Sequence, residues 1–456
     1  MKLNSYQPYL KILSESLARL DSWRESFGES GTEIIDSSSN VSIKNIVDRL
    51  EERLEGNYPF HHPQYAGQML KPPHPVAWIA YTLAMTINPN NHALDGGPPT
   101  SEMEKEVVSK LAEMVGYHSH YLGHLTSAGT IANLEALFVA RELHPQKTIA
   151  ATANAHYTHS RMCRVLNCDF IEIPVDSNGI PDLGFIEQNA EKIGTVVVTM
   201  GTTGLGLVEP LSEIKKIAER HGLRIHADAA YGGFFKIIEN QLSSKKDWNL
   251  LHECDSIVID PHKHGLQPYG CGSVLYKDSK VGKFFKHDSP YTYFSSDDLH
   301  LGEISLECSR AGASAAALWA TLELFPLNSD GLGSILKNCI FAANRFSTTL
   351  INTSGWSVYQ EPELDIVGYF KEPNQRNITS LNRLSRTLFK SGMADKKNGF
   401  HLSLFNVPVA HFATKFPDYS IDDDHVTILR STFMKESHLS FIDELTERLF
   451  QIESNI

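Results

Sequence analysis

The sequence predicts an α/β protein in which a large, mainly parallel β-sheet is covered by helices. Between residues 120 and 280, short apolar runs alternate with segments of helical spacing. Each run is often β-branched and bounded by turn residues, which is typical of buried strands in a parallel sheet. The predicted strands are Thr148–Thr152, Asp169–Ile173, Thr195–Thr199, Leu223–Ala227, Ser256–Ile259 and Gly272–Tyr276.

The chain before this region is predicted to be helical up to about residue 60, because apolar residues recur there at three- and four-residue spacing. The two apolar series are Leu10, Leu13, Leu17 and Leu20, then Ile46, Val47, Leu50 and Leu54. A stretch rich in proline and histidine follows over residues 59–75, where helices cannot run freely. A helix is then expected over Ser101–Val115.

Beyond the predicted sheet, the alanine-rich segment Leu306–Leu324 predicts a long helix. The remaining chain alternates helices with strand-like pieces such as Val426–Phe433 and closes with a helix over Phe441–Phe450. We therefore expect an N-terminal helical arm (1–70), a large sheet domain (71–330) and a small C-terminal α/β domain (331–456).

Composition narrows the class of partner. The 456 residues carry a formal net charge of −13, which argues against nucleic acid or an anionic membrane as a partner. No run of about 18 apolar residues occurs, so a soluble, cytoplasmic protein is expected. The six cysteines show no CxxC pair or regular framework and are expected to be reduced thiols.

The segment Thr126–Asn133 precedes an apolar helix and contains small and hydroxyl residues, including Gly129 and Thr130. Such residues at a helix start leave backbone N–H groups free to hold a phosphate dianion, which the helix dipole also favours. Ordinary helix capping is the alternative reading. The spacing matches neither GxxxxGK[ST] nor GxGxxG, so nucleotide binding gains no support.

Two further segments carry side chains suited to a flat heterocyclic ligand. His156, in Ala155–Ser160, offers a ring that can stack on one face of such a ligand, although a lone histidine is more often a packing residue. His156 and His159 together would also suit a metal, but no HExxH motif or carboxylate-completed triad accompanies them. Asp228 ends a predicted strand, where a buried carboxylate needs a cation such as a pyridinium nitrogen; capping of the next helix is its alternative.

Lys263 lies between two histidines in Asp260–Gly265, directly after the predicted strand Ser256–Ile259. A lysine in such a place can form a Schiff base with a carbonyl ligand once its amine is deprotonated. Most lysines are solvated surface residues, but the preceding strand has a buried composition. That context favours a chemical role for Lys263.

Together these segments resemble the group II amino-acid decarboxylases that depend on pyridoxal 5′-phosphate (PLP). The similarity lies in TSAGT with a following Asn, AHYTHS, GTTGLG, HADAAYGG and DPHK, in the same order and spacing, and it runs from about Tyr65 to Ala320. The family includes glutamate, aromatic-amino-acid, tyrosine, aspartate and diaminobutyrate decarboxylases. The short DPHKHG form is most similar to its bacterial and archaeal branch.

The resemblance implies an aspartate-aminotransferase-like fold (fold type I) with a seven-stranded sheet, PLP as cofactor, and decarboxylation of an L-amino acid. It also implies a role for each matching residue. Lys263 would bind PLP covalently, Asp228 would pair with the pyridine nitrogen, and His156 would stack on the opposite face from Ala230. The phosphate would be held by Gly129, Thr130, Asn133 and His262, and Thr203 would lie near the phenolic oxygen or the substrate carboxylate.

The source of the proton that replaces the carboxylate is left open. Animal aromatic decarboxylases carry a long loop with a tyrosine acid, and here Tyr291 and Tyr293 are the candidates, with an aromatic interface rim as the alternative. If neither serves, His156 or Lys263 must donate, and the outcome shifts toward oxidative deamination. Aldehyde synthase, carbon–carbon lyase and aminotransferase chemistry stay open, as does a non-catalytic PLP-binding scaffold.

The substrate is not predicted by the sequence. Tyr65 and His74 are candidate substrate contacts. Arg310 or Arg430 could hold a carboxylate, with a surface salt bridge as the alternative for either arginine. Family members are homodimers with the active site at the interface, and the amphipathic N-terminal helices would need such a partner to bury their apolar faces. A homodimer acting on a small amino acid is therefore expected.

Overall fold

The computed structural model describes residues 6–28, 43–286 and 304–456, and these form two sheets with their covering helices. The larger sheet has seven strands in the order β1-β7-β6-β5-β4-β2-β3. Only β7 runs antiparallel to its neighbours β1 and β6. The predicted α/β class with a mostly parallel seven-stranded sheet is confirmed. The strands are β1 (Leu122–Thr126), β2 (Thr148–Thr152), β3 (Phe170–Ile173), β4 (Ile193–Thr199), β5 (Arg224–Asp228), β6 (Ser256–Ile259) and β7 (Gly272–Tyr276).

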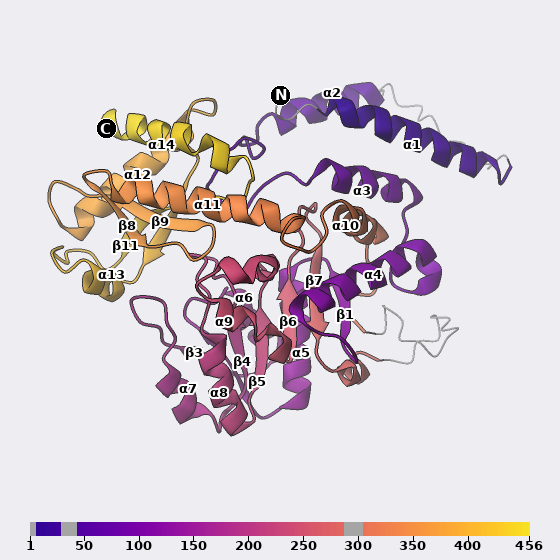
Figure 1. The fold of residues 1–456 in the computed structure, drawn as a ribbon, viewed down its shortest axis with the longest axis horizontal. Coiled ribbons are helices and arrows are strands. Elements are labelled where there is room, and N and C mark those ends of the chain that lie inside the picture. Colours follow the sequence, from indigo (N-terminus) through magenta and orange to yellow (C-terminus); the bar gives the residue numbers. More distant parts are fainter. Residues whose placement is uncertain (1–5, 29–42, 287–303) are drawn as a thin grey trace.

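Helices cover both faces of this sheet, as Figure 1 shows. Helix α5 packs on β6 and β7, while α10 packs against both α3 and α4. The main core contains the inward-facing residues of β4, β5 and β6 together with apolar residues of α4, α8 and α10. The helices are α3 (Pro75–Ile87), α4 (Pro98–Val115), α5 (Gly129–Leu143), α6 (Thr158–Leu166), α7 (Leu183–Asn189), α8 (Leu211–His221), α9 (Lys245–Trp248) and α10 (Gly312–Leu324).

The predicted helix over Leu306–Leu324 is wrong in its first turns, because α10 begins only at Gly312. The described residues before α10 are irregular and are held by hydrogen bonds to the sheet domain. The backbone N–H of Leu306 donates to Glu135, and the Arg310 side chain donates to Glu104 and to the Leu125 carbonyl. These long-range contacts outweigh the local helical preference of the segment.

The C-terminal part forms a four-stranded antiparallel sheet in the order β10-β11-β9-β8. Its own core packs aromatic residues between this sheet and two long helices, α11 and α14. The elements are α11 (Leu332–Ile351), β8 (Trp356–Gln360), β9 (Ile366–Lys371), α12 (Ile378–Ala394), β10 (Ser403–Val407), α13 (Val409–Lys415), β11 (Val426–Thr432) and α14 (His438–Ser454). The separate sheet is compatible with the expected small domain, whose boundaries stay a prediction.

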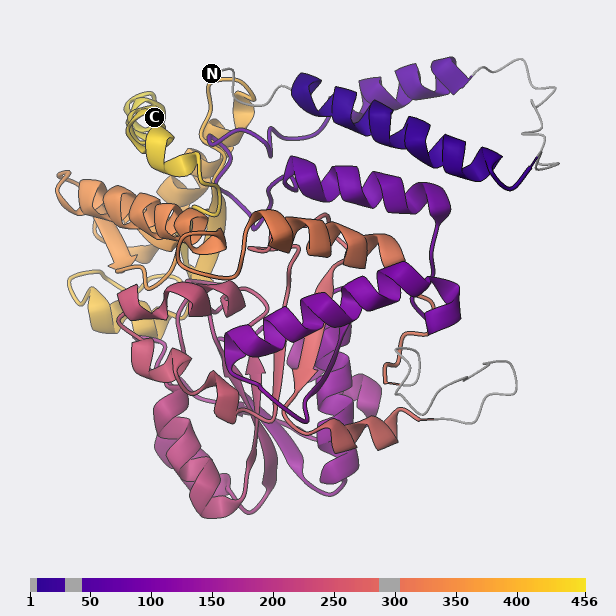
Figure 2. The same cartoon turned by 45° about the vertical axis from the view of Figure 1, so that its right-hand side comes forward.

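The N-terminal arm consists of α1 (Gln7–Glu25) and α2 (Ile43–Leu54). Figures 1 and 2 show the two helices side by side at the edge of the molecule, above α3. Neither helix contains a buried residue. Among the described residues, no helix combines the length and the apolar character needed to cross a membrane.

His124 on β1 and Glu135 in the middle of α5 form a fully buried pair, with 2.7 Å between His124 Nε2 and Glu135 Oε2. Burial raises the pKa of Glu135 to about 8, although the N–H of Leu306 donates to it. Burial, with the nearby charge of Arg310, holds the pKa of His124 well below its usual value. Near neutral pH the pair is therefore a protonated acid beside a neutral imidazole.

We expect Glu135→Gln to gain stability over wild type as the pH rises. A carboxyl whose pKa is raised in the folded state stabilises the fold below its unfolded pKa of 4.5, and that contribution is lost as the pH rises towards 8. The neutral amide of the variant does not titrate and so avoids this loss. The free energy of unfolding of the variant relative to wild type should therefore grow by on the order of 1 kcal/mol per pH unit between the unfolded pKa of 4.5 and the folded pKa of about 8. Denaturant unfolding of the purified protein without added ligand at pH 5, 6.5 and 8 measures this difference, with the exposed Glu113→Gln as control. A pH-independent difference would contradict this account.

Candidate functional site

The site lies at one edge of the large sheet, where strands β1, β2, β4, β5 and β6 all end. These strands run in the same direction, so the segments that follow them meet at the same edge. They surround a cavity of about 270 Å³. It is lined by Ala128, Gly129, Thr130, Asn133, His156, Tyr157, Thr158, Thr199, Gly201, Thr203, Asp228, Ala230, Tyr231, Asp260, His262 and Lys263.

The structure brings together all nine residues that the sequence assigned to cofactor binding. They come from five segments spread over 135 positions of the chain, from Gly129 to Lys263. Tyr65 and His74, the expected substrate contacts, do not line this cavity. Tyr65 is buried against His401 of the C-terminal part, and His74 caps the N-terminus of α3 by accepting from the N–H of Val76. Tyr291 and Tyr293 lie outside the described residues.

Lys263 and Asp228 provide opposite charges in the cavity. The Lys263 amine lies 3.1 Å from Oδ2 of the buried Asp260 and is about one quarter exposed, which leaves it accessible to a ligand. The carboxylate of Asp228 is buried, accepts from the backbone N–H of Ala230 at 3.2 Å, and lies 2.8 Å from His159 Nε2. Burial alone would raise the pKa of Asp228, but the hydrogen bond and charge of His159 hold this pKa below its usual value.

His156 presents a neutral ring to the cavity. Its Nδ1 accepts from the backbone N–H of Thr158 at 3.2 Å and lies 2.7 Å from the Thr158 hydroxyl. Burial lowers the pKa of His156, which outweighs the attraction of Asp228 for a proton on the imidazole. An uncharged ring held in this way is suited to stacking on a cationic heterocycle without adding repulsion.

The start of α5 lies at one end of the cavity and is suited to bind an anion. No side chain caps this N-terminus, and Ala128, Gly129 and Thr130 line the cavity. A Cβ on Gly129 would meet the carboxylate of Asp260 at 2.4 Å, so only glycine permits this close packing. Asn133 is held by a 2.8 Å hydrogen bond to His226 Nε2, and His262 donates from Nδ1 to the carbonyl of Cys271 at 2.7 Å.

Three contacts at the cavity were not predicted from the sequence, one of them local and two long-range. Asp260 faces Lys263, and His159 contacts Asp228, as described above. A third concerns Arg430 on β11, which was one of two candidate carboxylate ligands. Arg430 donates to the carbonyls of Thr203 and Gly204 at the rim of the cavity. The other candidate, Arg310, is instead paired with Glu104 at 2.6 Å and does not line the cavity.

The residues fit PLP in three respects: a buried carboxylate for a pyridinium nitrogen, an accessible amine for an aldehyde, and an uncapped helix start for a phosphate. A model of the pyridoxal-dependent decarboxylase conserved domain matches residues 37–371. The chain belongs to this family. PLP is therefore the cofactor of this decarboxylase, and its reaction is the removal of CO2 from an amino acid.

Curated relatives agree with this assignment. The decarboxylase is 25% identical to the L-tyrosine decarboxylase of Enterococcus faecium, over 84% of this chain and 82% of the relative. It is 27% identical to the L-aspartate decarboxylase of Thermococcus kodakarensis, over 73% of this chain and 85% of the relative. It is 25% identical to an L-2,4-diaminobutyrate decarboxylase of Acinetobacter baumannii, over 79% of this chain and 78% of the relative.

Solved structures share the fold. The structure of Oryza sativa TDC with PLP and tryptamine is similar with a TM-score of 0.78, at 16% identity and 99% coverage of both chains. The 4-hydroxyphenylacetaldehyde synthase of Rhodiola rosea is similar with a TM-score of 0.77, at 15% identity, over 100% of this chain and 99% of that one. The fold therefore does not discriminate between amine-forming and aldehyde-forming enzymes.

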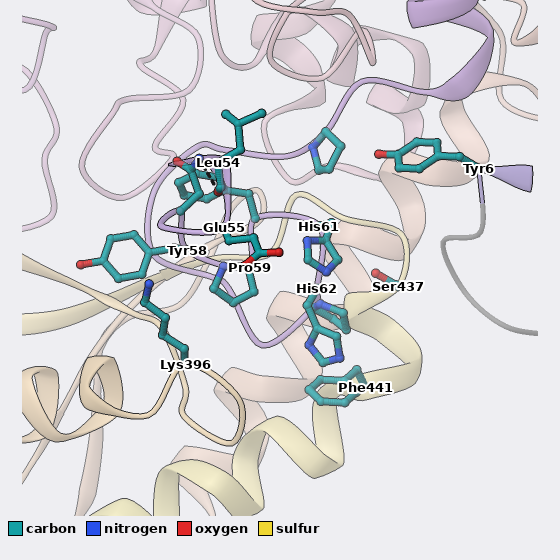
Figure 3. Close-up of a pocket in the computed structure, with 14 residues that line it drawn as sticks. Tyr6, Leu54, Glu55, Tyr58, Pro59, His61, His62, Lys396, Ser437 and Phe441 are labelled. Carbon is teal, nitrogen blue, oxygen red and sulfur yellow. Dashed lines mark hydrogen bonds between the residues drawn. The ribbon is translucent and has the colours of Figure 1, made fainter. Parts of the chain in front are cut away.

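A second, larger cavity of about 1010 Å³ lies between the N-terminal arm, the Pro- and His-rich stretch and α14. Figure 3 shows His61, His62 and Phe441 in a column on one side of it and Tyr58 beside Lys396 on the other. The rings of His62 and Phe441 meet edge to face at 5.2 Å. This cavity shares no lining residue with the first and lacks its pairing of a lysine with buried carboxylates, so the smaller cavity is the candidate active site.

Proposed function

We propose that this decarboxylase converts an L-amino acid to its amine and CO2 in the smaller cavity, with Lys263, Asp228 and His156 contacting the cofactor. The observation that carries the proposal is that these three side chains, from three separate strand ends, line one cavity. When bound, PLP supplies the electron sink that stabilises the carbanion left by CO2. The chain must bind the cofactor, orient the bond to be broken and control protons.

Each end of the cavity is suited to one part of this task. Asp228, ionised and buried, is suited to keep a pyridine nitrogen protonated, and the neutral ring of His156 to exclude water from one face. Gly129, Thr130, Asn133 and His262 are proposed to hold the phosphate at the start of α5. Asp260, 3.1 Å from the Lys263 amine, would hold that amine in place to bond to the cofactor aldehyde.

Arg430 is proposed to bind the substrate α-carboxylate. Its guanidinium is buried, and within the described part of the chain its hydrogen bonds go to three backbone carbonyls and the Ser403 hydroxyl. A buried cation that has only neutral partners favours an incoming anion. Its contact with Thr203 brings it to the rim of the cavity.

We expect Arg430→Met to raise KM for the substrate at least about tenfold, because one charge-assisted carboxylate contact is lost. The amine product lacks a carboxylate and gives the matched test. Its inhibition constant should stay within about twofold of wild type. If substrate and product affinity fall together, Arg430 supports the site structurally and does not bind the carboxylate.

The reaction and substrate are tested by measuring CO2, amine, aldehyde and H2O2 from the purified holoenzyme with each common L-amino acid and L-2,4-diaminobutyrate. The relatives named above make L-tyrosine, L-aspartate and L-2,4-diaminobutyrate the first candidates. Equal amounts of CO2 and amine from one amino acid would support the proposal. CO2 with aldehyde and H2O2 would replace it with aldehyde synthesis, and no CO2 from any amino acid would exclude decarboxylation of these substrates.

We also propose that the enzyme is a homodimer in which the N-terminal arm packs on a second copy. Helix α2 exposes an apolar stripe to solvent, with Ile46, Val47, Leu50 and Leu54 each 43–55% exposed. Such a stripe on a helix without buried residues costs free energy unless a partner covers it. The second copy is the proposed partner because a homodimer is the simplest closed assembly and the resemblance implies one.

We expect light scattering to give twice the chain mass of 50.9 kDa for wild type and a shift towards one chain mass for Leu50→Glu. A charge at this position opposes burial of the stripe. The neighbouring exposed Arg49→Glu is the control and should stay dimeric. A monomeric wild type at micromolar concentration, or equal effects of both variants, would contradict the proposed interface.

A cytoplasmic location is proposed from the thiols. All six cysteines are free, and four of them are buried. Unpaired cysteines without disulfides fit a reducing compartment.

A further inference from the structure

His159 is a buried residue in direct contact with the Asp228 carboxylate. Its side chain is 1% exposed and does not line the cavity. Nε2 of His159 lies 2.8 Å from Oδ2 of Asp228, while Oδ1 of the same carboxylate accepts from the N–H of Ala230. The two carboxylate oxygens are thus held by one side-chain donor and one backbone donor.

The second ring nitrogen of His159 shows that this contact is not ordinary core packing. Within the described residues, Nδ1 of His159 is buried and has no hydrogen-bond partner. The neighbouring buried His226 makes a useful comparison, since its Nδ1 contacts Ser256 and its Nε2 contacts Asn133. Burying an imidazole with one unsatisfied nitrogen costs free energy that an apolar side chain would avoid. Within the described part of the chain, the hydrogen bond to Asp228 is the one polar contact of the ring that offsets this cost.

The start of α6 connects the two proposed cofactor contacts. The backbone N–H of His159 donates to the carbonyl of His156 at 3.1 Å, so the two histidines are one turn apart. One short segment therefore supplies the ring that faces the cavity and the donor that holds Asp228. Burial of Asp228 favours its neutral form, and the His159 contact is the largest influence that keeps the pKa of this carboxyl low.

We propose that His159 is a positioning residue, which holds the Asp228 carboxylate by its Nε2–H in the orientation that binds the pyridine nitrogen of PLP. His159 itself touches neither the cofactor nor the substrate. This inference rests on the proposed role of Asp228, and it predicts that His159 affects the cofactor only through that carboxylate and that nitrogen.

The test is a double-mutant cycle on PLP affinity, measured by titrating apoenzyme and following absorbance or fluorescence. We expect His159→Phe to weaken PLP binding about tenfold, since one charge-assisted hydrogen bond to Asp228 is lost. His159→Gln keeps an N–H donor and should stay within about threefold of wild type. In an Asp228→Asn background, His159→Phe should change affinity less than about twofold, because the two substitutions remove the same interaction.

A cofactor analogue with carbon in place of the pyridine nitrogen provides an independent readout. His159→Phe should not weaken binding of this analogue, because the atom that Asp228 holds is missing. Equal weakening with PLP and with the analogue, or an undiminished effect in the Asp228→Asn background, would show a general packing role and overturn the inference. The thermal midpoint of each apoenzyme reports loss of folding separately, and His159→Gln keeps the test valid if the phenylalanine variant does not fold.

The same experiment separates the inference from the function on which it rests. If Asp228→Asn binds PLP as tightly as wild type, the proposed role of Asp228 fails. If Asp228→Asn weakens binding but His159→Phe does not, the role of Asp228 stands and the inference about His159 is wrong.

Discussion

Replacing Lys263 with alanine is expected to abolish the visible absorbance of the holoenzyme and to lower decarboxylation at least about 1,000-fold, equivalent to roughly 4 kcal/mol of barrier. In the proposed site, this absorbance would come from a covalent bond between the Lys263 amine and the cofactor. No other lysine lines the cavity, as far as the described residues go. PLP could still occupy the cavity of the variant without a covalent bond to the protein. The substrate amine would then have no lysine to displace from the cofactor, which slows the reaction.

Two further substitutions sharpen this prediction. Lys263→Arg keeps the positive charge beside Asp260 but offers no nucleophile, because a guanidinium stays protonated. It should lose the absorbance as fully as alanine does. Lys277→Ala removes an exposed lysine just after β7 that pairs only with Glu253, and its spectrum and rate should match wild type. A visible band that survives in Lys263→Ala would assign the cofactor to a different lysine.

The candidate site could be predicted from sequence because its residues occupy the ends of strands. Asp228 and Lys263 directly follow or end short apolar runs, and parallel strands deliver such residues to the same edge of a sheet. Three predicted strands match the structure at both ends: Thr148–Thr152, Ser256–Ile259 and Gly272–Tyr276. Strand β1 was not predicted, because Gly123 and His124 interrupt its apolar character.

The contacts that depend on packing between distant segments could not be predicted. His159 lies one turn after His156 in the sequence, but the packing of α6 against the sheet decides that it meets Asp228 and not a metal. Arg430 reaches Thr203 across 227 positions of the chain, which local patterns do not record. The same holds for Tyr65 and His74, whose expected role in substrate binding rested on composition alone, and whose side chains contact other parts of the fold.

Asp228→Asn is expected to lower kcat at least about 100-fold while leaving the visible absorbance in place at saturating PLP. The amide has the shape of the carboxylate but no charge, so it cannot keep the pyridine nitrogen protonated, and the cofactor becomes a poorer electron sink. A loss of roughly 3 kcal/mol corresponds to this change in rate. Because Lys263 is intact, the covalent bond to the cofactor still forms, which distinguishes this variant from Lys263→Ala.

Asp247→Asn is the matched control, since Asp247 is also buried but accepts from the N–H of Ser212 and does not line the cavity. Its kcat should stay within about twofold of wild type once folding is verified by the thermal midpoint. If Asp228→Asn also keeps its kcat, decarboxylation in this enzyme does not need a protonated pyridine nitrogen. The stabilisation of the carbanion would then have to come from Lys263, His156 and the phosphate end of the cavity, and the buried carboxylate would be a structural residue of β5.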